Sequence, residues 1–205
     1  SVGAQVRDDL LAAHIGKPAQ YVVIPPGISL GTLPNSLSAR ESLGVPQDAT
    51  TITFLGRITG IKRPDRFAEV ALKIASFNPK VLFLIVGSGD LVDSLKLQLS
   101  KIDSQVKFLG WRSDVENILS ATDILLLTSD NEGTPVSAIQ AGMAGVPTIS
   151  TNVGSVAEVI KDGSTGILTS LDPEEIATAL NSLISNPDLR IQLGKSAKTD
   201  MNARY

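Results

Sequence analysis

The sequence contains no cysteine and a single histidine, His14, among its 205 residues. Without cysteine the chain can form no disulfide and no thiolate metal site, and it has no thiol nucleophile. A catalytic triad or a histidine relay would have to use His14. That residue lies in a polar segment near the start of the chain and is expected on the surface. Most cysteine- and histidine-based chemistry is therefore excluded.

Aromatic residues and charges of one sign are also scarce. Phe, Trp and Tyr make up 4% of the sequence, and 18 basic against 21 acidic residues give a net charge of −3 without a basic block. A nucleic-acid groove needs concentrated Lys and Arg, so no nucleic-acid partner is expected. No apolar run is long enough to span a membrane, and the N-terminal stretch is too polar for a signal peptide. We expect a cytoplasmic protein without a transmembrane segment, with peripheral membrane association of the full-length protein left open.

Short apolar segments alternate with helix-like segments along the whole chain. Their continuous apolar character, without in-out alternation, is typical of parallel strands that are covered on both faces. The β-α-β order predicts right-handed crossovers, and hence an α/β fold with a Rossmann-like, doubly wound parallel sheet. Since no repeat or linker interrupts the pattern, residues 1–205 are predicted to form a single domain. The predicted strands are residues 21–24, 51–55, 81–86, 106–109, 123–128, 147–150 and 166–169.

Capping residues and prolines mark the helix starts. Pro64 stands at a first-turn position before a stretch with apolar residues at helical spacing. Asp172 and Asn186 each precede a proline, as a helix cap often does. Ser38 and Ser155 are each followed by Glu three residues later, which predicts two capping boxes.

Two motif matches point to chemistry that their surroundings exclude. Residues 27–31, GISLG, match the nucleophile elbow of hydrolases, but Pro34 interrupts the required helix and no histidine lies downstream. Residues 87–89, GSG, begin like a dinucleotide-binding fingerprint, but position 92 is Val and the next strand ends without a ribose-binding acid. The sequence also has no D-x-D motif, so no ligands for a metal-bridged diphosphate are visible.

A first candidate site follows the strand predicted at residues 51–55. In open α/β sheets, ligands bind beyond the carboxyl ends of the strands. Gly56, Arg57 and Lys62 lie in this loop, and two cations there can neutralise a diphosphate without a metal ion. Taken alone, both cations are equally compatible with solvated loop charges.

A second candidate site is the loop that follows the strand predicted at residues 123–128. Pro135 is placed for the first turn of a helix that runs through residue 144, and free N–H groups at that start can receive phosphate oxygens. Gly133 lets the backbone approach a ligand closely. Glu132 could accept hydrogen bonds from ligand hydroxyls, although the helix dipole alone favours an acid there by about 0.3–1 kcal/mol. Gln140 is also compatible with an ordinary exposed amide.

A resemblance decides between these alternatives. Glu132 and Gln140 are eight positions apart, and residues 131–168 are similar to the donor-binding signature of family 4 retaining glycosyltransferases. Other segments of the chain resemble further motifs of that family in the same order. The resemblance therefore extends from about residue 6 to residue 193. These further motifs are Ile24–Ile28 (IPPGI), Gly56-Arg57 with Lys62, FLIVGSGDL and VKFLGWRSDV.

The resemblance implies the C-terminal half of a GT-B enzyme, in which two Rossmann-like domains face each other and the C-terminal one holds a nucleotide-sugar donor. It implies that Arg57 and Lys62 bind the diphosphate and stabilise it as the leaving group, while Glu132 holds hydroxyls of the donor sugar. The nucleotide-diphosphate sugar is the donor substrate, and neither a metal ion nor another cofactor is expected. The donor-binding residues implied are Gly133, Thr134 and Pro135 at the phosphates, Gly87, Gly89, Gly110, Trp111 and Arg112 at the nucleoside, and Gly56 and Gln140.

Two positions depart from the family pattern. Gln140 stands where the family usually has a second glutamate that grips the ribose, and Gly154-Ser155 stands where it usually has Gly-Gly. An amide can still donate and accept hydrogen bonds, but without a charge, so weaker ribose binding is expected. Ser155 is interpreted as a helix cap.

In this family an acceptor domain precedes the donor domain and contributes an active-site histidine. His14 lies in the wrong place in the sequence to be that histidine. We therefore expect half of a transferase, poorly active alone, whose partner is the absent N-terminal acceptor domain. Two alternatives remain open: a non-catalytic nucleotide- or sugar-binding module, and a related GT-B enzyme such as a sugar-nucleotide epimerase.

Overall fold

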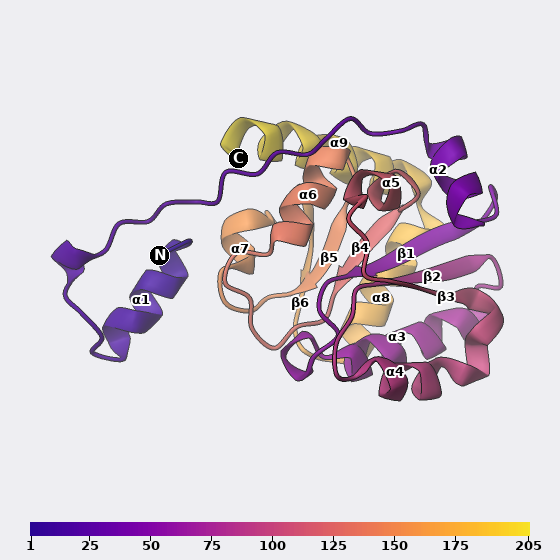
Figure 1. The fold of residues 1–205 in the computed structure, drawn as a ribbon, viewed down its shortest axis with the longest axis horizontal. Helices are drawn as coiled ribbons and strands as arrows, with labels where there is room; N and C mark the ends of the chain where they lie inside the picture. Colours follow the sequence, from indigo (N-terminus) through magenta and orange to yellow (C-terminus); the bar gives the residue numbers. More distant parts are fainter.

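The computed structural model describes residues 1–205 and is built around one sheet of six parallel strands (Figure 1). The strand order is β3-β2-β1-β4-β5-β6. The predicted α/β fold with a Rossmann-like, doubly wound parallel sheet is confirmed. The strands are β1 (Thr50–Leu55), β2 (Val81–Val86), β3 (Val106–Gly110), β4 (Ile124–Leu127), β5 (Thr148–Thr151) and β6 (Gly166–Thr169).

Helices cover both faces of the sheet, and alternate side chains of each strand enter two cores. On one face, Phe54 and Phe83 pack edge-to-face against Phe67 of α3, with ring centroids 5.4 and 5.9 Å apart. On the other face, strand residues such as Leu125 pack against α5, α6 and α7. No helix combines the length and the apolar character that crossing a bilayer requires. The helices are α1 (Ala4–Ala12), α2 (Ser36–Leu43), α3 (Pro64–Phe77), α4 (Val92–Leu99), α5 (Val115–Ser120), α6 (Val136–Ala144), α7 (Val156–Val159), α8 (Pro173–Ser185) and α9 (Pro187–Arg204), with 3₁₀ turns η1 (Pro18–Gln20), η2 (Gly60–Lys62) and η3 (Ser100–Gln105).

The order of the strands places two loops opposite each other. β1 pairs with β2 on one side and with β4 on the other, with Ile52 beside Ile124. The chain therefore builds β2 and β3 outward in one direction and then returns to add β4, β5 and β6 in the other. The loops after β1 and β4 leave the sheet at this reversal, which is where open α/β sheets bind ligands.

One predicted strand is wrong, and another is shorter than predicted. Residues 21–24 are extended but belong to no strand, and Val22 and Ile24 are 67% and 68% exposed. The apolar run finds no sheet neighbour. Its backbone bonds instead to Pro18, which accepts from the Tyr21 N–H, and to Ser1, which donates its terminal amine to the Val22 carbonyl and accepts from the Ile24 N–H. β4 begins at Ile124, and the preceding Asp123 bonds to Thr51 of β1 through its carboxylate and its N–H.

Three predicted helix starts are confirmed, whereas neither of the two predicted capping boxes forms. Pro64 opens α3, and the side chains of Asp172 and Asn186 accept backbone hydrogen bonds at the starts of α8 and α9. Ser38 lies inside α2, whose cap is instead Asn35, accepting from the Leu37 N–H at 2.8 Å. Ser155 does occupy the cap position of α7, but its side chain makes no capping hydrogen bond.

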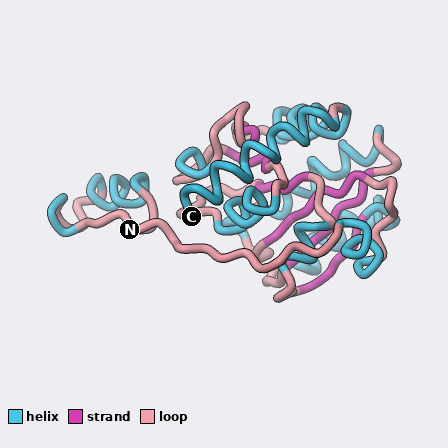
Figure 2. Tube along the Cα trace, turned by 90° about the horizontal axis from the view of Figure 1, so that it is seen from above, coloured by secondary structure: helices cyan, strands magenta, loops and turns pink.

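Helix α1 lies beside the rest of the molecule and joins it through a long extended segment (Figures 1 and 2). None of its residues is buried, and His14, just after it, is exposed as predicted. A helix of nine residues is marginal on its own. Its first turn is fixed by Glu158 of α7, whose carboxylate accepts hydrogen bonds from the backbone N–H groups of Ala4 (2.9 Å) and Gln5 (2.6 Å).

The electrostatics of Glu158 follow from this contact. Partial burial raises the pKa of its carboxyl group, but the hydrogen bonds from Gln5 and Ala4 stabilise the charged form and bring the pKa below its ordinary value. A carboxylate with a depressed pKa stabilises the docked state fully above its ordinary pKa, about 4.3, and loses this contribution as the pH falls through the depressed value. The docking of α1 is therefore weaker in acid than at neutral pH.

Replacing Glu158 by Ala is expected to release α1, because the two N–H groups then lose their acceptor. Hydrogen exchange measured at pH 7 should be faster in residues 4–12 of Glu158→Ala than in the wild type. Glu69→Ala, which removes an exposed carboxylate on α3 that bonds to nothing, serves as the control. Equal exchange rates in the two variants would show that the carboxylate does not hold α1.

Candidate functional site

The two predicted cations of the loop after β1 differ in exposure and in whether they have a partner within the protein. The Arg57 side chain is exposed and makes no hydrogen bond or ion pair within the protein. Lys62 ends the turn η2 and is half-buried. Arg57 is thus available to a ligand, whereas Lys62 is already held by the protein.

Lys62 and Glu132 form the central ion pair of the site. Nζ of Lys62 lies 2.7 Å from both carboxylate oxygens of Glu132, whose side chain is only 7% exposed. The Ser129 hydroxyl donates a further hydrogen bond to Glu132 Oε1 at 2.7 Å. The structure therefore joins two side chains that the sequence assigned to separate tasks, and it adds Ser129, which the sequence reasoning missed. An ammonium group has three N–H donors, so Lys62 keeps one for a ligand.

A cavity of about 200 Å³ opens beside Arg57 at the carboxyl ends of β1, β2 and β3. Trp111, 74% exposed, lines it together with Arg112. Arg112 pairs with Asp114 through two hydrogen bonds of 2.8 and 2.5 Å, which hold the pKa of that carboxyl group below its ordinary value. Most residues predicted around a nucleoside thus come together here. The lining residues are Leu55, Gly56, Arg57, Val86, Gly87, Ser88, Trp111 and Arg112.

Two of the predicted glycines are required by the packing of the loops themselves. A Cβ atom on Gly87 would lie 1.9 Å from the Gly56 carbonyl oxygen, and one on Gly89 would lie 2.1 Å from the Ile58 carbonyl oxygen. Gly89 does not line the cavity. The glycines after β2 therefore let its loop lie against the loop after β1, which explains them without a ligand.

The loop between β4 and α6 contains the remaining predicted residues. Gly133 is exposed, and nothing lies within 4 Å of the position of a Cβ atom there. The Thr134 hydroxyl donates to the Val2 carbonyl at 3.1 Å, so it meets the N-terminal segment. Pro135 caps α6 rather than standing in its first turn, because its ψ of 90° is not helical. Gln140 is half-buried on α6 and its amide bonds to no protein group.

The backbone of Glu132 is fixed by the residues that replace the family's Gly-Gly pair. Gly154 has φ +52°, and a Cβ atom on it would lie 2.0 Å from the Glu132 carbonyl oxygen. The Ser155 N–H donates to that same oxygen at 2.9 Å. Glycine is thus needed at position 154, while position 155 contributes through its backbone.

Three further charged residues tie the two loops together, and the sequence reasoning missed them. Arg66 donates to the Thr128 carbonyl (2.6 Å) and to Asp130 (2.8 Å), and Arg63 donates to Asp130 at 3.1 and 3.2 Å. Arg63 adopts φ +48°, an unusual backbone conformation for a residue with a side chain. The sequence gives little sign of this contact: Arg63 and Arg66 lie at the start of a predicted helix, and Asp130 lies two residues before Glu132.

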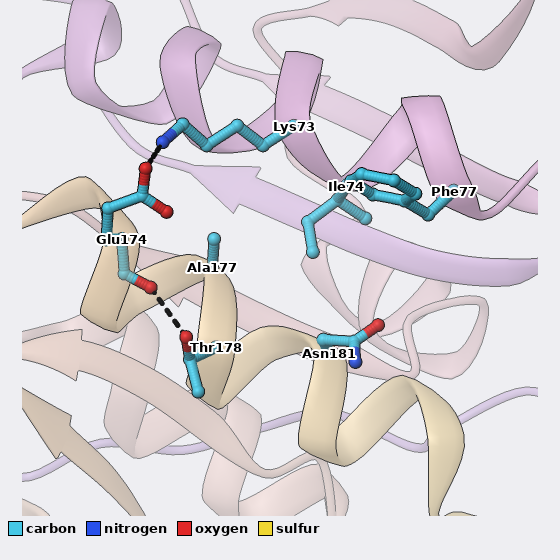
Figure 3. A pocket seen from close by; sticks show the side chains of 7 residues that line it. All are labelled: Lys73, Ile74, Phe77, Glu174, Ala177, Thr178 and Asn181. Carbon is cyan, nitrogen blue, oxygen red and sulfur yellow. Dashed lines mark hydrogen bonds and ion pairs between the residues drawn. The ribbon is translucent and has the colours of Figure 1, made fainter.

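The largest cavity, about 540 Å³, lies away from this site between α3 and α8 (Figure 3). Lys73 and Glu174 form an ion pair across it, and Phe77 is 83% exposed at its end. Its remaining lining residues are Ile74, Ala177, Thr178 and Asn181. None of the residues predicted for the site lines this cavity. Nowhere in the structure do three or more His, Asp or Glu side chains converge as metal ligands do.

Comparison with known proteins places this arrangement in a family. Two solved structures superimpose closely: Anabaena Alr3699/HepE in complex with UDP and glucose (TM-score 0.90, 23% identity, 100% of this chain and 58% of that one), and the C-terminal domain of the group 1 glycosyl transferase family protein LpcC from Francisella tularensis (0.74, 23%, 83% and 93%). At these identities they show the fold, which is that of GT-B glycosyltransferases.

Sequence similarity then gives the family. Residues 36–200 match the family described as glycosyl transferases group 1, and the chain belongs to it. It is 31% identical over 183 residues to the UDP-Gal:alpha-D-GlcNAc-diphosphoundecaprenol alpha-1,3-galactosyltransferase of Escherichia coli, covering 85% of this chain and 47% of that protein. The chain spans about half the length of the curated relatives it matches.

Replacing Gly154 by Ala is expected to destabilise the fold by about 2–4 kcal/mol, because the methyl group meets the Glu132 carbonyl and the left-handed backbone disfavours any Cβ. Gly163→Ala is the matched control, since Gly163 has φ +68° but open space around it. It should cost only about 1 kcal/mol. Urea unfolding measures both values. Equal losses would mean that the contact with Glu132 adds nothing to the strain.

Substitution of Arg63 by Gly and by Ala separates backbone strain from charge. Both variants lose the ion pairs with Asp65 and Asp130, but only glycine adopts φ +48° without strain. We expect Arg63→Gly to be more stable than Arg63→Ala by about 1 kcal/mol in the same unfolding experiment. A more stable Ala variant would contradict the left-handed conformation at this position.

Proposed function

We propose that residues 1–205 form the C-terminal, donor-binding domain of a retaining glycosyltransferase that transfers a sugar from a nucleotide-diphosphate sugar without a metal ion. One observation carries the proposal: in a domain of this family, an unpaired arginine and the Lys62–Glu132 pair lie on the two loops that leave the sheet at its reversal. The solved structure of Anabaena Alr3699/HepE, which shares the fold, contains UDP and glucose. These facts favour a nucleoside diphosphate as the ligand.

In this proposal the cations act on the diphosphate. Arg57 offers a guanidinium group with no competing carboxylate, and Lys62 offers its remaining N–H donor. Both stabilise the negative charge that grows on the phosphate as the bond to the sugar breaks. Free N–H groups at the start of α6, behind the open backbone of Gly133, receive further phosphate oxygens.

The remaining residues orient the donor. Glu132 holds hydroxyls of the sugar, and it is kept charged and in place by Lys62 and Ser129. The nucleoside occupies the cavity beside Trp111, with Arg112 at its border. The acceptor hydroxyl attacks the sugar on the face from which the diphosphate departs and gives its proton to the departing phosphate oxygen. The configuration is thus retained without a protein nucleophile.

The acceptor is supplied by a second, N-terminal domain in this proposal. The matched relatives are about twice as long as this chain, and the similar structure from Francisella tularensis is described as a C-terminal domain. Residues 1–24 present exposed apolar side chains, with Val2, Ile15, Val22 and Ile24 between 47% and 68% exposed. Alone, the domain should bind nucleotide and transfer little, since no closed cleft excludes water.

Calorimetry with UDP, GDP and ADP tests the proposal, and the single tryptophan offers a second readout because Trp111 lines the cavity. At least one of the three should bind at millimolar concentration or below and change the Trp111 emission. Absence of binding by all three would reject the proposed function. Transfer by a full-length enzyme, against binding without turnover, then separates a transferase from a non-catalytic module.

Arg57→Ala should weaken binding of the preferred diphosphate by about 1.5–3 kcal/mol, roughly tenfold to a hundredfold, while the matching nucleoside binds nearly as before. The reason is that the guanidinium, although it borders the nucleoside cavity, bonds in this proposal to the phosphates and not to the base or the ribose. Lys80→Ala, at the opposite edge of the sheet, is the control because Lys80 is an exposed cation paired with Asp48. Equal losses for nucleoside and diphosphate would refute this role of Arg57.

A further inference from the structure

The charged groups of the site come from two loops that are distant in sequence. Lys62 lies in the loop after β1 and Glu132 in the loop after β4, and their side chains meet at 2.7 Å. Both side chains are flexible, so their ion pair alone does not determine how far apart the two backbones lie. Another set of contacts must fix that spacing.

Asp130 makes these contacts through both its backbone and its side chain. Its N–H donates to the Ile61 carbonyl at 2.9 Å. Its carboxylate accepts from Arg66 Nη2 at 2.8 Å and from Arg63 Nη1 at 3.1 and 3.2 Å. Residues of the β1 loop therefore surround Asp130, although it belongs to the β4 loop.

Arg66 anchors this contact in the rigid part of the fold. Its side chain is 6% exposed, and it stands in the first turn of α3, whose start is fixed by Pro64. While one guanidinium nitrogen bonds Asp130, the other donates to the Thr128 carbonyl at 2.6 Å. The Thr128 hydroxyl in turn donates to the carbonyls of Lys62 and Arg63, both at 3.1 Å. We call this ion pair, together with its Thr128 contacts, the Arg66–Asp130 clasp. Through the Thr128 hydroxyl the clasp contacts the backbone carbonyl of Lys62.

Resting on the proposed function, we infer that Arg66 and Asp130 are positioning residues for diphosphate recognition. Neither needs to touch the ligand. They hold the backbones of Lys62 and Glu132 at the spacing that lets the ammonium group meet a phosphate while the carboxylate meets the sugar. Loss of the clasp therefore weakens the recognition of the diphosphate and leaves the nucleoside cavity beside Trp111, on the β2 side, unchanged.

The test compares the nucleoside diphosphate that the wild type binds, among UDP, GDP and ADP, with its own nucleoside. In Asp130→Ala, affinity for the diphosphate should fall about tenfold, the scale of a small misplacement of binding groups, and affinity for the nucleoside less than about twofold. Asp130→Asn keeps an acceptor for Arg66 and should recover part of the loss. Asp48→Ala removes an equally paired but remote carboxylate and should match the wild type.

Hydrogen exchange of the unliganded variants supplies a readout independent of nucleotide. In Asp130→Ala, residues 61–63 and 128–135 should both exchange faster, since each loop loses its hold on the other. Unchanged exchange, or equal loss of nucleoside and diphosphate affinity in Asp130→Ala, would overturn the clasp while the wild type still binds nucleotide. Failure of the wild type to bind any of the three nucleotides would reject the proposed function and the inference with it.

Discussion

β1 and β4 lie side by side although two other strands separate them in sequence, and their pairing brings Lys62 and Glu132 together. Ile52 stands beside Ile124, so the loops that leave the two strands face each other at their carboxyl ends. The buried faces of both strands are packed on both sides by helices, which leaves the register little freedom. The Lys62–Glu132 ion pair is a consequence of this register. A shift of either strand would separate the two side chains.

The sheet and its edge could be predicted from the sequence because the signals are local. Continuous apolar runs such as residues 81–86 and 166–169 predict buried parallel strands, and both are found with those bounds. The glycines and charges that follow the strands predicted at residues 51–55 and 123–128 led to Arg57, Lys62 and Glu132. The run at 21–24 has the same composition as a buried strand and still forms none. What it lacks is a neighbouring strand, and a single segment of sequence carries no information about neighbours.

The contacts between the loops could not be predicted, since they depend on side chains that the fold brings together over long distances in sequence. Glu158 illustrates the problem. Its position three residues after Ser155 predicts a local capping box, but in the structure its carboxylate caps α1, which lies more than a hundred residues earlier in the chain. Asp130 likewise looks like an ordinary loop acid in the sequence, but in the structure its carboxylate pairs with the buried Arg66. In both cases tertiary partners outweigh the local preference.

The charges in the two loops of the site nearly cancel, so the net charge of the site is small. Every carboxylate near the proposed diphosphate position is paired with a cation: Glu132 with Lys62, Asp130 with Arg63 and Arg66, and Asp65 with Arg63. Among these groups only Arg57 has no protein partner, so the net positive charge of the site is small and is concentrated in one side chain. A weak overall field attracts anions poorly at a distance. If the site binds a diphosphate as proposed, recognition depends on where the paired groups are held, and residues that do not meet the ligand then affect its affinity.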